Sequence, residues 1–252
     1  MMSISRRFAS AALIGLMGLE IAQAAAVGGE PPARALDLSR WKLTLPTDRQ
    51  GRGQADEILQ PQLDSFQDVD WFFVNGRGDG VVFRANCGGA TTPGSKFPRS
   101  ELREMTGRGA ELASWSTADE DVHEMTARLA VMRTPVVKKH VSCAQIHDGR
   151  SDLLMVRVEG KKLLIERDGA DDVVLDSNYV LGSPFDLKIE AGGGRVRAWR
   201  DGEARMDWEV SRAGCFFKAG CYTLSNPERG DAPDAVGEVV IFRLEVKHRD
   251  RR

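Results

Sequence analysis

Apolar residues recur along the chain in short runs or alternating stretches, without the 3.6-residue period of amphipathic helices. Ten such stretches stand out: Trp71–Val74, Val81–Ala85, His123–Val131, Leu153–Val158, Leu163–Glu166, Val173–Leu175, Leu187–Glu190, Val196–Trp199, Met206–Val210 and Glu238–Val246. Pairs such as Asn75-Gly76 and Asp201-Gly202 lie between them, and such pairs close tight hairpins. The pattern predicts an all-β sandwich or jelly roll of two antiparallel sheets.

Three stretches place polar or ionisable side chains on alternating positions, where a strand would normally bury apolar ones. They are Arg99, Glu101 and Arg103 in the first, Gln145 and His147 in the second, and Lys218 and Tyr222 in the third. Because side chains on a strand alternate between its two faces, Leu102, Ile146 and Phe217 should point the opposite way. If the three strands are neighbours, the polar set forms one surface whose only acid is Glu101. Such a surface suits a polyanion.

Composition limits the organisation of the chain. The sequence has 252 residues, of which 42% are hydrophobic and 29% charged, as is ordinary for a soluble globular protein. We find no repeat or linker, and residues 25–252 are predicted to form a single domain. The formal net charge is −2, so attraction to a polyanion must be local, and neither a nucleic acid nor a membrane is expected as a partner.

The first 24 residues have the features of an export signal. Arg6 and Arg7 precede the apolar run Phe8–Leu19, and Ala22–Ala24 offers a small-x-small cleavage site. The apolar run is shorter than the ~20 residues of a spanning helix. We therefore predict a signal peptide over residues 1–24 and a secreted or periplasmic protein. Whether export follows the general or the twin-arginine route stays open.

Four cysteines, Cys87, Cys143, Cys215 and Cys221, form an even set in an exported chain, which favours disulfides with three possible connectivities. On one straight strand Cys215 and Cys221 would be about 20 Å apart, so a bridge between them needs a bend at 216–220. A zinc site is the alternative, but the chain has no C-x-x-C pair and no histidine cluster nearby. We expect disulfides and no metal.

The three polar stretches resemble, in order and spacing, signature segments of the alginate lyases of polysaccharide lyase family 7. The matching segments are Arg99-Ser-Glu-Leu-Arg-Glu104, Gln145-Ile-His147 and Phe217-Lys-Ala-Gly-Cys-Tyr222. The opening segment Leu36–Pro46 resembles the family's first strand, so the resemblance spans roughly Leu36 to Lys247. It implies a β-jelly roll with the substrate in a concave groove. It also implies a monomer without a cofactor that cleaves alginate by β-elimination, giving 4,5-unsaturated products.

The resemblance also assigns roles to individual residues. Arg99, Gln145, His147 and Tyr222 match the catalytic positions, Arg103 and Lys218 match substrate contacts, and Glu101 is expected to orient the arginines. The chemistry agrees, because a C5 proton beside a uronate carboxylate becomes acidic only when that carboxylate is neutralised, and Arg99 and Gln145 offer donors for it. His147 is then expected to accept the proton and Tyr222 to protonate O4.

Departures from the family pattern concern specificity. Leu224 stands where the family usually has a glutamine, on the face that Tyr222 would share if the strand continued. Ile146, between the glutamine and the histidine, tends in the family to accompany action on guluronate-containing blocks, so guluronate or mixed blocks are expected.

The segments 51–70 and 228–234 are candidate lids over the groove. Endo or exo action stays open.

Other classes of function remain possible at this stage. A lectin-like module would bind a uronate polymer on the same surface without cleaving it, and a lyase could act on another polyuronate such as glucuronan. A glycoside hydrolase would need two carboxylates about 5 to 10 Å apart across the bond. Glu101 and Glu104 have opposite parity on a strand, which disfavours them as such a pair.

Overall fold

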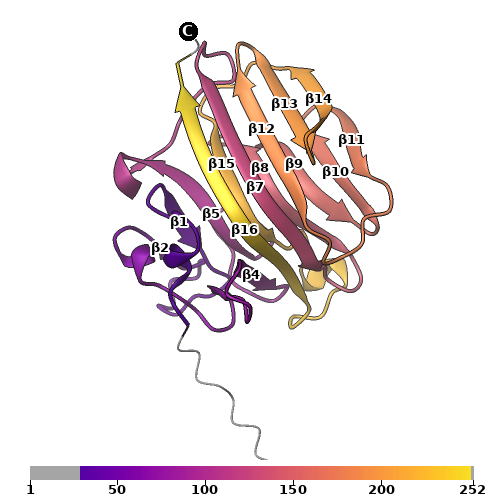
Figure 1. The fold of residues 1–252 in the computed structure, drawn as a ribbon. Coiled ribbons are helices and arrows are strands. Elements are labelled where there is room, and N and C mark those ends of the chain that lie inside the picture. The colour runs from indigo at the N-terminus through magenta and orange to yellow at the C-terminus, as the bar shows by residue number, and fades with distance from the viewer. Residues whose placement is uncertain (1–28, 251–252) are drawn as a thin grey trace, which may run out of the picture.

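The structure, a computed structural model, describes residues 29–250. The chain folds into two antiparallel sheets that face each other, as predicted for a β-jelly roll sandwich (Figure 1). The predicted signal peptide, residues 1–24, lies outside the described residues. In the described part, no helix is long and apolar enough to cross a membrane.

The first sheet, here called the front sheet, carries the candidate site. Its spatial order is β11 (Ala170–Asp176), β10 (Lys162–Arg167), β9 (Asp152–Glu159), β8 (His140–His147), β15 (Phe216–Tyr222), β5 (Arg99–Thr106), β1 (Trp41–Thr44) and β2 (Glu57–Ile58), with β6 (Glu111–Leu112) paired to β5. The second, or back, sheet runs β14 (Glu203–Glu209), β13 (Arg195–Arg200), β12 (Phe185–Gly192), β7 (Val122–Arg133), β16 (Val236–Arg249), β4 (Val81–Asn86) and β3 (Phe72–Val74). The described helices are short 3₁₀ turns: η1 (Pro32–Arg34), η2 (Gln62–Asp64), η3 (Gly107–Gly109) and η4 (Pro227–Arg229).

Strand β15 lies between β8 and β5, so the three polar stretches are neighbours although these strands begin far apart in the sequence, β5 at Arg99, β8 at His140 and β15 at Phe216. Lys218 pairs in register with Arg103 on one side and with Gln145 on the other. Tyr222 pairs with Arg99. The predicted polar surface therefore exists as a continuous floor across three strands.

The opposite faces of these strands form the core. Leu102, Ile146 and Phe217 are fully buried and belong to one apolar cluster with Phe83 and Leu129 of the back sheet. Each such side chain contributes about 1.5–3 kcal/mol when it is removed from water. The alternation read from the sequence is thus confirmed on all three strands, and the core fixes which face the polar residues occupy.

Leu224 does not behave as the alternation predicted. Strand β15 ends at Tyr222, and Leu224 adopts a left-handed backbone conformation (φ 50°) with only 8% of its surface exposed. Side chains alternate only along extended backbone, so the face of Tyr222 does not continue to Leu224. The expectation that Leu224 occupies the groove face is therefore wrong.

The predicted disulfides are absent from the described residues, where Cys87, Cys143, Cys215 and Cys221 are buried free thiols. Cys221 lies near the end of β15 and Cys215 just before its start, and the intervening segment runs as a strand without the bend that a bridge would need. Burial raises the pKa of the Cys143 and Cys215 thiols to about 12, which keeps both protonated at neutral pH.

Candidate active site

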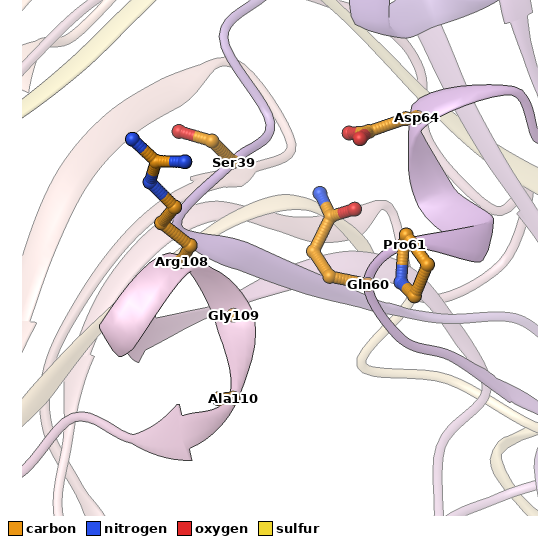
Figure 2. Close-up of a pocket in the computed structure, with 7 residues that line it drawn as sticks. All are labelled: Ser39, Gln60, Pro61, Asp64, Arg108, Gly109 and Ala110. Carbon is orange, nitrogen blue, oxygen red and sulfur yellow. The ribbon is translucent and has the colours of Figure 1, made fainter.

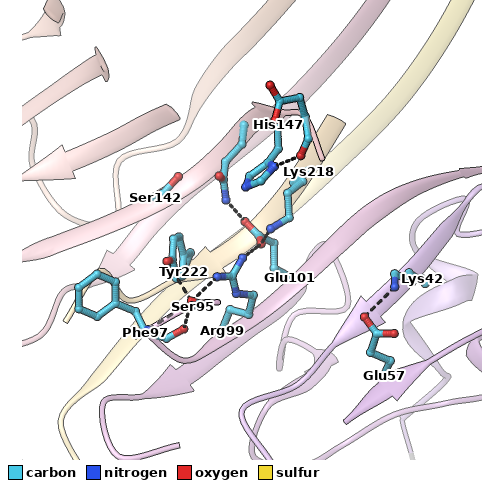
Figure 3. A network of polar contacts seen from close by, with 12 residues as sticks. Lys42, Glu57, Ser95, Phe97, Arg99, Glu101, Ser142, His147, Lys218 and Tyr222 are labelled. Carbon is cyan, nitrogen blue, oxygen red and sulfur yellow. Dashed lines mark hydrogen bonds and ion pairs between the residues drawn. The ribbon is translucent and has the colours of Figure 1, made fainter. Parts of the chain in front are cut away.

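A cavity of about 510 Å³ lies over the floor of the front sheet, within the range of roughly 300–1,000 Å³ of small-ligand sites. Of the predicted site residues, Arg99, Arg103, His147, Lys218 and Tyr222 line it. They come from β5, β8 and β15, and Figure 3 shows Arg99, His147, Lys218 and Tyr222 near Glu101. The two predicted residues that do not line the cavity, Glu101 and Gln145, lie beneath it.

Glu101 is the centre of the site's charge network. Its carboxylate is fully buried and accepts from Arg99 Nη1 at 3.2 Å, from Lys218 Nζ and from Gln145 Nε2 (Figure 3). Burial alone would raise the pKa of Glu101, but Lys218 and Arg99 beside it hold that pKa below its ordinary value. Glu101 therefore stays ionised and orients Arg99, as predicted, but its other partners are Lys218 and Gln145. The second arginine of the prediction, Arg103, stacks over Phe216 instead.

Gln145 is 1% exposed, and its amide nitrogen is directed at Glu101 rather than at open space. An amide nitrogen carries two hydrogens, and Glu101 uses only one of them. The structure thus places Gln145 under the floor, with a single remaining donor for a ligand that enters the cavity above it.

Tyr222 is held from two sides. The Arg99 guanidinium carbon lies 3.8 Å from the centre of the Tyr222 ring, a cation–π contact, and the phenol oxygen lies 3.2 Å from Ser95 Oγ. Burial raises the pKa of Tyr222, although Arg99 acts in the opposite direction. At neutral pH the side chain is therefore a protonated phenol that can donate.

His147 has a defined neutral form. Its Nδ1 contacts the Asp148 carbonyl oxygen, which can only accept, so Nδ1 carries the proton and Nε2 the free lone pair. Burial, reinforced by nearby Lys218, lowers the pKa of His147 and keeps the ring neutral. The ring also stacks on Phe216, with centroids 5.4 Å apart.

The turn after His147 is fixed by hydrogen bonds to Asp148. Its carboxylate accepts from the backbone nitrogens of Arg150 and Ser151 at 2.5 and 2.7 Å, and from Arg212 Nη1 at 2.6 Å. The carbonyl that sets the tautomer of His147 therefore belongs to a rigid turn.

A row of cations crosses the floor perpendicular to the strands. Lys42 on β1 pairs in register with Arg103, which pairs with Lys218, so three positive side chains lie on adjacent strands about 4.8 Å apart. Arg103 stacks over Phe216 at 3.9 Å, and Lys42 forms a 2.6 Å ion pair with Glu57. Burial lowers the pKa of Lys218 to about 8, and Glu101 offsets part of that effect.

Sequence reasoning missed several residues that line this cavity: Lys42, Glu57, Ser95, Arg150, Asp152 and Phe216. Phe216 shares the parity of Lys218 and Tyr222 on β15, and Lys42 lies between the buried Trp41 and Leu43 of β1, so alternation could have identified both. Glu57 lies on the two-residue edge strand β2, Asp152 is the first residue of β9, and Ser95 and Arg150 lie in loops. Alternation gives no information at such positions.

The two candidate lids differ in the structure. Segment 51–70 supplies Glu57 to the cavity wall. Segment 228–234 is not among the lining residues. It follows Asn226, whose side chain donates to the Lys96 carbonyl at 3.0 Å, and it carries Arg229, which lies 6.0 Å from the Phe97 ring centre. It therefore braces the loop before β5.

A second cavity, of about 630 Å³, lies beside η2 and η3 (Figure 2). Its ionisable lining residues are Asp64 and Arg108, and neither a histidine nor a tyrosine lines it. It therefore lacks a group suited to proton transfer near neutral pH. His123, His140 and His248 also lie outside the floor cavity. Within residues 29–250, no cluster of three or more His, Cys, Asp or Glu side chains is arranged to hold a metal ion.

Comparison with known proteins shows that the sequence is similar to alginate lyases. A family model described as alginate lyase matches residues 36–248. An alginate lyase of Klebsiella pneumoniae is 38% identical over 289 aligned positions, which cover 88% of this chain and 92% of the relative.

Solved structures give the same result. The alginate lyase AlgAT5, of polysaccharide lyase family 7, superposes with a TM-score of 0.83 at 46% identity, covering 87% of this chain and 99% of that one. The alginate lyase of a Corynebacterium species superposes with a TM-score of 0.82 at 40% identity, covering 87% and 98%. The similarity thus extends over nearly the whole length of each relative.

Proposed function

The chain belongs to the alginate lyase family and is an alginate lyase, and from its site we propose that it cuts alginate by β-elimination with His147 as base and Tyr222 as acid. One observation carries the proposal. A neutral imidazole with a free Nε2 and a protonated phenol line the same cavity, on either side of the cations that Glu101 holds.

The cations address the first difficulty of the reaction. The proton on C5 is weakly acidic because its removal places a second negative charge beside the uronate carboxylate. Arg99 and Lys218 lie at the floor with their charges fixed by Glu101, and Gln145 retains one amide hydrogen. Fixed donors of this kind stabilise charge as it develops, without reorganisation during the reaction.

Two proton transfers complete the elimination. His147 Nε2 takes the C5 proton, and the electron pair of that C–H bond forms the C4–C5 double bond. The C4–O4 bond breaks at the same time, and the Tyr222 phenol protonates the departing O4. The imidazolium then returns its proton to the phenolate through solvent, so the enzyme is regenerated. The products are a new end at O4 and an unsaturated uronate.

The row of Lys42, Arg103 and Lys218 suits a polymer that lies across the strands. Successive carboxylates of the chain would meet one cation per strand, and the row continues beyond the reacting residue toward β1. The row of cations attracts the anionic polymer locally, whereas the protein's net charge of −2 does not attract it.

The geometry disfavours a glycoside hydrolase. Glu101 and Glu104 are both fully buried, and Glu104 faces the other side of β5, where it binds Trp115. Glu57 and Asp152 line the cavity but lie on β2 and β9, five strand steps or about 24 Å apart along the sheet. Such a separation exceeds the roughly 5–10 Å needed across one glycosidic bond.

The direct test is to incubate the protein with alginate and to follow the ultraviolet absorption of the C4–C5 double bond. Absorption should rise with alginate and should persist in excess chelator, because Arg99, Lys218 and Gln145 neutralise the carboxylate. A complete loss of activity in chelator, restored by a divalent ion, would show that a metal performs this task. Activity on glucuronan in place of alginate would favour the alternative polyuronate, and binding without cleavage would indicate the lectin-like module.

The block preference is proposed from Ile146. This side chain is fully buried on the core face, so it acts only through the packing that sets how far His147 and Gln145 project. We expect higher initial rates on polyguluronate or mixed blocks than on polymannuronate, and a reduced ratio in Ile146→Val. A clear preference of the wild-type protein for polymannuronate would refute this prediction.

We also propose that the protein acts outside the cytoplasm, because alginate is a large external polymer and residues 1–24 have the pattern of an export signal. Sequencing the N-terminus of the protein recovered after export checks this proposal. It should begin after Ala24, and an intact leader would contradict it.

A further inference from the structure

Ser95 lies on the loop before β5, and its single hydroxyl group has four polar neighbours. Arg99 Nη2 lies at 2.7 Å, the Phe97 backbone nitrogen at 3.3 Å, the Phe97 carbonyl oxygen at 3.2 Å and the Tyr222 phenol oxygen at 3.2 Å. The recognised segments begin at Arg99, so Ser95 lies outside them. Its position between Arg99 and Tyr222 gives it a direct link to the reacting phenol.

The chemistry of a hydroxyl determines how these contacts are shared. A serine hydroxyl has one hydrogen to donate and two lone pairs that accept. Arg99 and the Phe97 nitrogen can only donate, so they occupy the two lone pairs. The single Ser95 hydrogen is therefore left for one of two acceptors, the Phe97 carbonyl or the Tyr222 oxygen.

We propose that Ser95 is a positioning residue that donates its hydrogen to Tyr222 Oη as the phenol becomes a phenolate. The proposal rests on the role of Tyr222 as proton donor given above. While Tyr222 is protonated, the Ser95 hydrogen has the Phe97 carbonyl as an equivalent partner at 3.2 Å. When Tyr222 releases its proton to O4, the negative oxygen becomes the stronger acceptor and the Ser95 hydrogen turns to it.

Arg99 strengthens this donor. Its guanidinium donates to Ser95 Oγ at 2.7 Å, and hydrogen bonds in a chain polarise one another. The positive charge of Arg99 thus reaches the phenolate by two routes, across the ring face at 3.8 Å and through the Ser95 hydroxyl. Both interactions favour the state of Tyr222 in which the proton has been transferred.

The loop that carries Ser95 is fixed on both sides. Asn226 Nδ2 donates to the Lys96 carbonyl at 3.0 Å, and Thr223 Oγ1 donates to the Pro98 carbonyl at 3.0 Å. The Phe97 ring lies 6.1 Å from the Tyr222 ring, centre to centre. Ser95 is therefore held at the phenol before the substrate enters, as a preorganised donor requires.

The test is to measure the pKa of Tyr222. The chain has only two tyrosines, so this pKa can be measured separately once the other tyrosine is removed. We would titrate tyrosinate absorbance in a Tyr179→Phe background, where the Tyr222 signal stands alone. Ser95→Ala should raise the pKa of Tyr222 and lower kcat by roughly 10-fold to 100-fold, the effect of losing one hydrogen bond to a charged group, with KM little changed. Ser95→Thr retains a hydroxyl and should restore both.

A purely structural role of Ser95 predicts a different result. If Ser95→Ala lowers activity while the pKa of Tyr222 stays at its wild-type value, Ser95 only braces the loop and the inference is wrong. Should Ser95→Ala fail to fold, Ser95→Cys, whose thiol is a weak donor, gives the same two readouts. Failure of the proposed function is recognised separately, as near-normal turnover in Tyr222→Phe, and it leaves the titration result unaffected.

Discussion

Tyr222→Phe should lower turnover on alginate by about 10²–10⁴-fold, the usual value of a positioned proton donor. The change removes only the phenol oxygen. The ring keeps its packing against Phe97 and its contact with Arg99, 3.8 Å from the ring centre, so the floor and its cations should remain in place. The apparent affinity for alginate should therefore change little, which steady-state kinetics on purified polymer can establish.

The second tyrosine provides the matched control. Tyr179 is buried and does not line the cavity, and its hydroxyl accepts from the Val131 nitrogen at 3.0 Å and donates to the Ser183 carbonyl at 2.7 Å. Tyr179→Phe should lower thermal stability while leaving the turnover of the folded protein near the wild-type value. If Tyr222→Phe also keeps near-normal turnover, the phenol does not protonate O4 and the assignment of Tyr222 is wrong.

His147→Ala should reduce turnover by a similar factor, because Nε2 of the neutral ring is the proposed base for the C5 proton. The wild-type pH profile tests the same role. Burial, together with Lys218, lowers the pKa of His147 below the ordinary 6.5, so the neutral base is present above the lowered pKa and is lost as the pH falls through it. Turnover should thus persist below pH 6.5 before it declines.

A control for His147 lies on the same strand. His140 begins β8, is 8% exposed and does not line the cavity, so His140→Ala should leave the acid limb of the profile unchanged. An acid limb of wild-type turnover at or above pH 6.5 would contradict the proposed environment of His147. Retention of that limb in His147→Ala would show that another group titrates.

The floor could be predicted because β-structure has a strict period of two. Alternation assigned Arg99, Glu101 and Arg103 to one face and Leu102 to the other, and burial of the apolar face in the core then fixed the orientation. The family resemblance supplied what local pattern cannot, namely that three strands far apart in the sequence are neighbours. The prediction that Glu101 orients cations also came from the sequence, because a single buried carboxylate among cations is stable only when it is paired with them.

The features that the sequence did not predict correctly depend on contacts between distant segments or on where a strand ends. Ser95 lies in a loop, where no periodicity indicates that its hydroxyl meets Tyr222 and Arg99. Leu224 was misplaced because the end of a strand is not marked by alternation, and its left-handed conformation turns the chain away. The disulfides were predicted from the number of cysteines and the expected compartment. Except for Cys215 and Cys221, no distances between cysteines follow from the sequence, and these distances decide whether two cysteines can bond.

The products formed in water enriched in heavy oxygen test the central claim most directly, because elimination breaks C4–O4 without adding water. Mass spectrometry of alginate digested by the wild-type protein should show fragments with an unsaturated end, one water lighter than hydrolytic fragments, and no heavy oxygen at the cut. One heavy oxygen atom per cut, with saturated ends, would mean that the bond is hydrolysed and would contradict the mechanism assigned to His147 and Tyr222.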